Sequence, residues 1–132
     1  MTAASKILVV DDDIDFLDQV SMILKADGYD VVTANGQSEA EDALLSVTPD
    51  LCVVDLMMEN QDSGFILCHE IKRLHPGAPV ILLTGVRSST GLDFTACSAD
   101  AASWTKADAF MDKPVRPEQL KAEVKRLLAS RG

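Results

Sequence analysis

The sequence predicts an α/β fold in which a doubly wound, five-stranded parallel sheet carries five helices on its two faces. Short continuous apolar runs alternate with longer stretches in which apolar residues recur three or four positions apart. Such alternation is typical of strands and helices that succeed one another in a parallel sheet. The 132 residues are the length of one domain, so we expect a single domain over residues 1–132.

The five expected strands are continuous apolar runs of the kind that fills a buried parallel sheet. They cover residues 7–10, 31–34, 51–54, 80–83 and 109–111. Parallel neighbours need a long crossover between them, and the helical stretches supply it. We expect a flavodoxin-like strand order, with any ligand bound beyond the carboxyl ends of the strands.

The five expected helices each present an apolar stripe. They carry this stripe over residues 16–24, 40–47, 65–74, 94–104 and 120–128. Gly28 is expected to end the first helix. Ser38 is expected to cap the second helix and Pro49 to end it. Pro117 suits the first position of the last helix.

The charge balance argues against some classes of partner. Lys and Arg together number 12 and Asp and Glu 21, which gives a net charge of −9. A surface this acidic repels phosphate backbones and anionic lipids, so we expect no nucleic-acid and no membrane binding by this domain. The sequence shows neither a membrane-spanning run nor a secretory signal, and the expected location is the cytoplasm.

Three cysteines, Cys52, Cys68 and Cys97, stand among mostly apolar neighbours and form no Cys-x-x-Cys pair. We interpret them as reduced thiols in or near the core. A zinc site or a catalytic thiol is the lesser alternative.

Chemically active side chains follow four of the expected strands. Asp11 and Asp12 follow the first, Asp55 ends the third, Thr84 the fourth, and Lys113 comes shortly after the fifth. Carboxylates a few ångströms apart repel one another by about 1–4 kcal/mol per pair, so the cluster needs a compensating charge. Mg²⁺ suits a site with few carboxylates, a carbonyl and water, and no Gly-rich loop is present to bind a nucleotide.

Each of these residues also has an ordinary structural interpretation. An acid after a strand often caps the next helix, and we expect Asp13 or Asp15 to do so for the first helix. Thr84 alone could satisfy backbone groups, and Lys113 alone could be a surface charge. The combination, with each group at the end of a different strand, favours a functional site.

The stretches ILVVDDD, PDLCVVDLMM, PVILLTG and DAFMDKPV resemble the receiver domain of bacterial two-component response regulators, and the similarity spans essentially the whole chain. The resemblance implies that Asp55 is the phosphoacceptor. It also implies that Asp12, Asp55 and the main-chain carbonyl of Met57 bind Mg²⁺ directly, while Asp11 acts through a water molecule.

The same resemblance assigns the remaining site residues. Lys113 would pair with the acceptor carboxylate and then with the phosphoryl oxygens. Thr84 would hydrogen-bond the phosphoryl group and move on activation, and Phe110 would be an aromatic switch residue that turns inward with it. Such a domain assists its own phosphorylation and dephosphorylation but turns over no separate substrate.

The resemblance also implies the partners. The donor would be a sensor histidine kinase or a phosphotransfer protein, or a small acyl phosphate. The receiver would control a downstream output protein or domain, and a homodimer would form through the fourth helix, fifth strand and fifth helix.

The sequence departs from the family pattern in two long segments. Glu59 stands where a proline is common, and the loop from Asp55 to Gly64 is longer than usual. Residues 86–107, which include Trp104, also contain more residues than the family norm. We expect Glu59 to weaken metal or phosphoryl binding, and we interpret the second segment either as a surface reshaped for a partner or as a tolerated insertion.

Met57 and Val86 hold the positions two residues beyond Asp55 and Thr84. Apolar side chains there cannot orient an attacking water, so we expect a long-lived phosphoaspartate.

Three rival functions remain at this stage. A haloacid-dehalogenase-type phosphatase would use the Asp-x-Asp of Asp11 and Asp13, but Asp15 replaces the threonine-like residue of that family and no cap domain fits. A flavodoxin would need a hydroxyl- and Gly-rich loop after the first strand. A receiver-like interaction module that no longer cycles phosphate is the strongest alternative, and Glu59 favours it.

Overall fold

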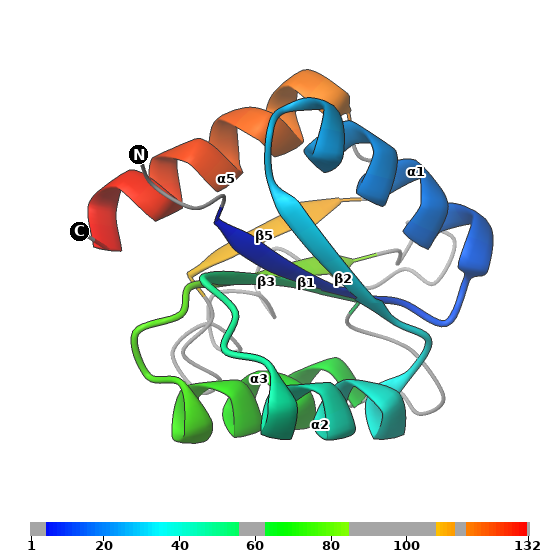
Figure 1. Ribbon diagram of the computed structural model, residues 1–132, viewed down its shortest axis with the longest axis vertical. Coiled ribbons are helices and arrows are strands. Elements are labelled where there is room, and N and C mark those ends of the chain that lie inside the picture. Colours follow the sequence, from blue (N-terminus) through cyan, green and yellow to red (C-terminus); the bar gives the residue numbers. More distant parts are fainter. Residues whose placement is uncertain (1–4, 56–62, 85–107, 113–115, 132) are drawn as a thin grey trace, which may run out of the picture.

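The computed structural model of the chain describes residues 5–55, 63–84, 108–112 and 116–131. Over this part the fold is a five-stranded parallel sheet in the order β2-β1-β3-β4-β5. Helices α1 and α5 lie on one face of the sheet, and α2 and α3 lie on the other (Figure 1). The strands are β1 Lys6–Val10, β2 Asp30–Ala34, β3 Leu51–Asp55, β4 Val80–Thr84 and β5 Ala109–Asp112. The helices are α1 Ile14–Ala26, α2 Gln37–Ser46, α3 Ser63–Leu74 and α5 Pro117–Arg131.

This arrangement confirms the predicted α/β class and the doubly wound strand order. The five strands are those expected from the apolar runs, to within a residue at each end. The expected helix over residues 94–104 lies outside the described residues. Pro117 is the first residue of α5, as predicted, because its fixed φ suits a helix start and its missing N–H is not needed there.

The core has two halves, one on each face of the sheet. Alternate residues of each strand point to opposite faces. Val54 and Leu82 thus pack toward α2 and α3, whereas Val53 and Leu83 pack toward α1 and α5. Every residue of β3 is buried. Burial of each large aliphatic side chain contributes about 1.5–3 kcal/mol, so the central strands are the most strongly held part of the sheet.

The ends of α1 are formed by local hydrogen bonds. Asp13 is the N-cap, and its Oδ1 accepts from the backbone N–H of Asp15 at 3.0 Å and of Phe16 at 3.4 Å. At the other end Gly28 takes a φ of 95°, its N–H donates to the Lys25 carbonyl, and the N–H of Tyr29 donates to the Leu24 carbonyl. This pair of bonds is a Schellman motif. The structure therefore confirms Gly28 as the stop and selects Asp13 over Asp15 as the cap.

The expected bounds of the second helix were wrong at both ends. Its N-cap is Gly36 rather than Ser38, and no side chain caps it there. Gly36 has a φ of 123°, which a residue with a Cβ rarely adopts, and Glu39 reaches back to accept from the N–H of Asn35 at 2.6 Å. The helix ends at Ser46 because Val47 is already extended, so the backbone leaves the helix before Pro49.

Two other expectations bear on location and thiol chemistry. No helix in the described ranges is long and apolar enough to cross a membrane. Cys52 and Cys68 are buried free thiols, as predicted, and Cys97 lies outside the described residues.

Candidate functional site

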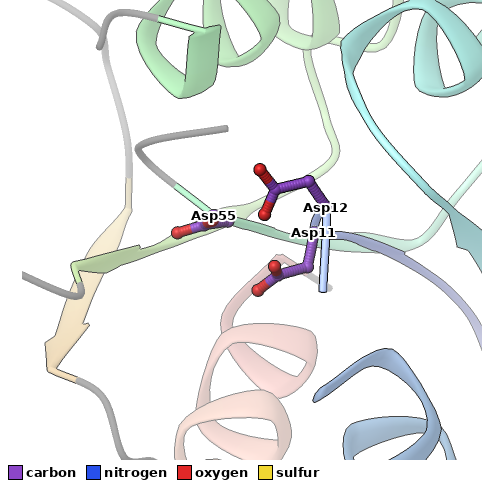
Figure 2. A group of neighbouring side chains, drawn as sticks. All are labelled: Asp11, Asp12 and Asp55. Atoms are coloured by element: carbon purple, nitrogen blue, oxygen red, sulfur yellow. The ribbon is translucent and has the colours of Figure 1, made fainter. Parts of the chain in front are cut away.

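Three carboxylates meet at the carboxyl ends of β1 and β3. Asp11, Asp12 and Asp55 each offer one oxygen atom, and these atoms all lie within 4.8 Å of one another. Figure 2 shows the three side chains gathered at the ends of these two neighbouring strands. The strand register explains the meeting, because Val10 is paired with Val54 and the next residue on each strand is an aspartate.

Backbone contacts hold Asp11 from two directions. Its N–H donates to the carbonyl of Ala34 at the end of β2, at 3.2 Å. Its Oδ1 accepts from the N–H of Asp13 at 2.9 Å. Asp11 is fully buried, whereas Asp12 is exposed. Asp11 and Asp12 therefore differ in environment: the side chain of Asp11 is buried, whereas that of Asp12 is exposed to solvent.

Asp55 is the last residue of β3 and is only 4% exposed. On its other side it is paired with Leu83 of β4. A carboxylate that loses most of its hydration is costly to keep ionised, and two such groups beside a third repel one another as well. A cation with oxygen ligands would relieve both costs. The start of α1, one residue beyond Asp13, adds the favourable partial positive charge of a helix N-terminus.

The carboxyl ends of β4 and β5 lie at the same end of the sheet as these carboxylates. Thr84 follows Leu83, the partner of Asp55, and is itself paired with Asp112, the last residue of β5. The backbone of Thr84 thus lies one step beyond Asp55 on the adjacent strand; its side chain is outside the described part of the chain. Met57 and Lys113 also lie outside the described residues, Lys113 directly after Asp112.

Phe110, the expected switch residue, lies in the middle of β5. Its side chain is half-buried and packs against the core half on the α2–α3 face. Its neighbour Met111 is buried on the opposite face. Phe110 is therefore a partly exposed aromatic residue on the strand that leads to Lys113.

Cys52, the second residue of β3, is a buried thiol whose pKa is shifted by its surroundings. Burial raises the pKa of the Cys52 thiol far above its ordinary value, and the neighbouring Cys68 raises it further. Cys52 therefore stays protonated and is a poor nucleophile, which agrees with a structural role for this thiol.

A family model for the response regulator receiver domain matches residues 7–125. The chain belongs to this family. Receiver domains of response regulators are signalling proteins of two-component systems, and the four motifs that suggested the resemblance all fall within the matched residues.

Relatives and solved structures agree with the family. DNA-binding response regulator MtrA of Mycolicibacterium smegmatis is 29% identical over 124 residues, which cover 94% of this chain and 50% of MtrA. The chain thus spans about half the length of the curated relatives it matches. A CheY-like receiver domain from Methanospirillum hungatei superposes with a TM-score of 0.86 at 28% identity, covering 98% of this chain and 97% of that one. Response regulator TrrA of Thermotoga maritima, solved in complex with Mg²⁺-BeF, has a TM-score of 0.77 at 30% identity, covering 93% and 98%.

One group of polar residues was missed by reasoning from the sequence. At the opposite end of the strands, the Nζ of Lys72 in α3 lies 2.8 Å from Oδ2 of Asp108, the residue just before β5. The two residues are 36 positions apart, so no local pattern could pair them. The only signal was an isolated acid directly before an apolar run.

Proposed function

We propose that this domain accepts a phosphoryl group on Asp55 from a phosphohistidine of a sensor histidine kinase or a phosphotransfer protein. A carboxylate oxygen of Asp55 would attack phosphorus, the phosphorus–nitrogen bond would break, and the imidazole would leave with the bonding electrons and take up a proton. The product is an acyl phosphate. The observation that carries the proposal is the nearly buried Asp55 carboxylate beside Asp11 and Asp12 at the strand ends.

The acidic cluster fits a magnesium ion. Mg²⁺ prefers oxygen ligands at about 2.0–2.1 Å and usually keeps several waters. Oxygen atoms within 4.8 Å of one another can share such an ion when one of them acts through water. We assign Asp12, Asp55 and the main-chain carbonyl of Met57 as direct ligands and Asp11 as the ligand through water. The ion would supply positive charge to the carboxylates and the phosphoryl oxygens.

Asp11 has a further task in this proposal. Its bond with the N–H of Asp13 fixes the position of its carboxylate, through Oδ1. The same turn places Asp13 as the cap of α1, so the start of the helix and the site are built together. Asp11 would thus hold the water-mediated contact in place without itself accepting the phosphoryl group.

Thr84, Lys113 and Phe110 complete the proposed switch. Lys113 would balance charge on the acceptor and then on the phosphoryl group, whose two negative charges would also draw the Thr84 hydroxyl. Support comes from the sheet, since Thr84 and Asp112 are paired one step beyond Asp55 and Lys113 is the next residue. Phe110 is only half-buried, so an inward turn would remove apolar surface from water.

The signal would pass to an output domain or a separate output protein. MtrA is a DNA-binding response regulator of which this chain covers 50%, whereas this domain has a net charge of −9 and is not expected to bind nucleic acid itself. A homodimer through the segment over 94–104, β5 and α5 is the proposed route between the switch and the output. The proposed setting is the cytoplasm, and no separate substrate would be turned over.

Intact-mass spectrometry after incubation with acetyl phosphate and Mg²⁺ tests the proposal. The parent protein should gain the mass of one phosphoryl group, and Asp55→Asn should gain none. Glu59, an acid four positions after Asp55 in the sequence, favours the second candidate, an interaction module that no longer cycles phosphate. Absence of a mass gain on the parent protein, with Mg²⁺ at saturating concentration, would favour that module.

A further inference from the structure

We propose that Lys72 and Asp108 are positioning residues that set the register of β5 and thereby place Lys113 at the phosphoacceptor site. The inference rests on the proposed function for the role of Lys113. It concerns a site far from the carboxylates, at the amino ends of β4 and β5, and it assigns a functional consequence to an ion pair there.

Four hydrogen bonds converge on this ion pair. The Nζ of Lys72 donates to Oδ2 of Asp108 at 2.8 Å and to the carbonyl of Ala78 at 2.9 Å. The same Oδ2 accepts from the N–H of Val80 at 2.8 Å, and the N–H of Asp108 donates to the carbonyl of Val80 at 2.9 Å. We call this group, Lys72, Ala78, Val80 and Asp108, the β5 clamp. It ties the residue before β5 to both β4 and α3.

The lysine side of the clamp is shielded from water. The side chain of Lys72 is 17% exposed and that of Asp108 is 35% exposed. A charged hydrogen bond in such a position is stronger than one on the open surface, and loss of either partner leaves the other incompletely solvated. The contrast with the neighbouring pair on α3 lies in the cation: Arg73 is 62% exposed, whereas its partner Glu70, at 32%, is about as exposed as Asp108.

β5 needs such a determinant of register. It has four residues, it is an outer strand of the sheet, and its first three side chains, which alternate between the two faces, are apolar. Phe110 packs toward α2 and α3, and Met111 packs toward α1 and α5. A slip by one residue would exchange the faces of Phe110 and Met111. Both faces are apolar, so hydrophobic burial alone discriminates weakly between these two registers. The clamp supplies the missing specificity, because a slip would separate Asp108 from both Val80 and Lys72.

The register of β5 determines the position of Lys113, which directly follows the last residue of the strand. In the observed register Ala109 is opposite Ile81 and Asp112 is opposite Thr84. A slip of one residue moves the end of β5 by about 3.3 Å and turns the following side chain to the other face of the sheet. A misplacement of about 1 Å at a reacting group can cost about 100-fold in rate, so even partial loosening of β5 should slow phosphorylation.

The first experiment compares Asp108→Ala with the control Glu70→Ala. Glu70→Ala breaks the exposed ion pair with Arg73 on the same helix as Lys72 but touches no residue of the clamp. We expect Asp108→Ala to lower the rate of phosphorylation by acetyl phosphate about tenfold. We expect Mg²⁺ affinity, measured by calorimetry, to change less than about twofold, because the metal-binding acids lie on β1 and β3. Glu70→Ala should leave both quantities within about twofold.

A double-mutant cycle shows whether the effect passes through the lysine. In a Lys113→Ala background, Asp108→Ala should produce no further loss of rate. An equal loss in both backgrounds, or an unchanged rate for Asp108→Ala alone, would overturn the proposal. Lys72→Arg, which keeps the cation, should retain the parental rate, and Lys72→Met should lower it.

Two further cases need a separate measurement: a parent protein that is not phosphorylated, and an Asp108→Ala variant that does not fold. If the parent protein is not phosphorylated on Asp55, the proposed function fails, but the register argument is still tested by amide exchange within β5. Exchange of the Phe110–Asp112 amides should accelerate at least about tenfold in Asp108→Ala and not in Glu70→Ala. If Asp108→Ala does not fold, Asp108→Asn retains an acceptor for the N–H of Val80 and takes its place. Unchanged exchange in a folded variant would refute the register role.

Discussion

The two ends of the sheet treat charge in opposite ways. At the carboxyl ends, the three carboxylates of Asp11, Asp12 and Asp55 are brought within 4.8 Å of one another. At the amino ends, Asp108 meets Lys72 at 2.8 Å. Like charges held together store repulsion that a cation or a chemical change can release, whereas opposite charges lower the free energy of the fold at once. The acidic cluster therefore needs a compensating charge, whereas the charges of Lys72 and Asp108 already balance each other.

Removal of the acceptor should give the largest effect. Asp55→Asn keeps the size of the side chain but removes the nucleophilic carboxylate, so phosphorylation by acetyl phosphate should fall below detection. Intact mass measures this directly. Asp108→Asn, the equivalent change at the other end of the sheet, should still be phosphorylated. A stable phosphoryl adduct on Asp55→Asn would show that the acceptor lies elsewhere.

Loss of a metal ligand should give the next largest effect. Asp12→Asn removes a proposed direct ligand and should weaken Mg²⁺ binding by about 100-fold, while Asp11→Asn, which acts through water, should weaken it by about tenfold. Titration calorimetry of each variant gives the two dissociation constants. Asp13→Asn, which retains an N-cap side chain, serves as the control. Equal losses for Asp11 and Asp12 would contradict the division into direct and water-mediated ligands.

In the metal-free protein, substitutions at the two ends of the sheet should change the free energy of unfolding in opposite directions. Without Mg²⁺, Asp55→Asn relieves repulsion among nearly buried carboxylates and should raise the free energy of unfolding by about 1–2 kcal/mol. Asp108→Asn weakens a favourable ion pair and should lower it by about 1–2 kcal/mol. Urea unfolding in the presence of a chelator measures both. Saturating Mg²⁺ should reverse the first difference and leave the second unchanged; a shift of the same sign in both variants would remove the contrast.

The site was more predictable than the rest because topology, not detailed packing, assembles it. Asp11 and Asp55 each follow a short apolar run, and adjacent parallel strands must bring such residues to the same edge. No knowledge of side-chain conformation was needed. The roles assigned to Met57, Thr84 and Lys113 came from family resemblance, and they stay predictions because the structure does not describe those side chains or, for Met57 and Lys113, the backbone.

Two features show where reasoning from the sequence failed. Ser38 has the chemistry of a cap, but the backbone turns at Gly36, where a φ of 123° is available, and the helix starts earlier. The contact between Lys72 and Asp108 joins residues on different elements, and neither residue has a neighbour in sequence that indicates it. Local propensity and strand order leave such choices open, since they depend on backbone dihedral angles and on the packing of a helix against a strand edge.

The smallest expected effect lies at the exposed ion pair of α3. Hydrogen bonds from Arg73 lower the pKa of the Glu70 carboxyl below its ordinary value. As pH falls, the unfolded chain therefore takes up this proton first. The stabilisation is present above the unfolded-state pKa and is lost as pH falls through the folded-state pKa.

Glu70→Gln should consequently lose slightly less stability than the parent protein when pH is lowered from about 6 to about 3, because its side chain no longer titrates. Urea unfolding at a series of pH values measures the difference between the two proteins, which cancels the titration of every other group. Because the pair is exposed to solvent, the difference should also shrink in high salt. An equal loss of stability in the parent protein and in Glu70→Gln over this pH range would show that the pair with Arg73 does not stabilise the fold.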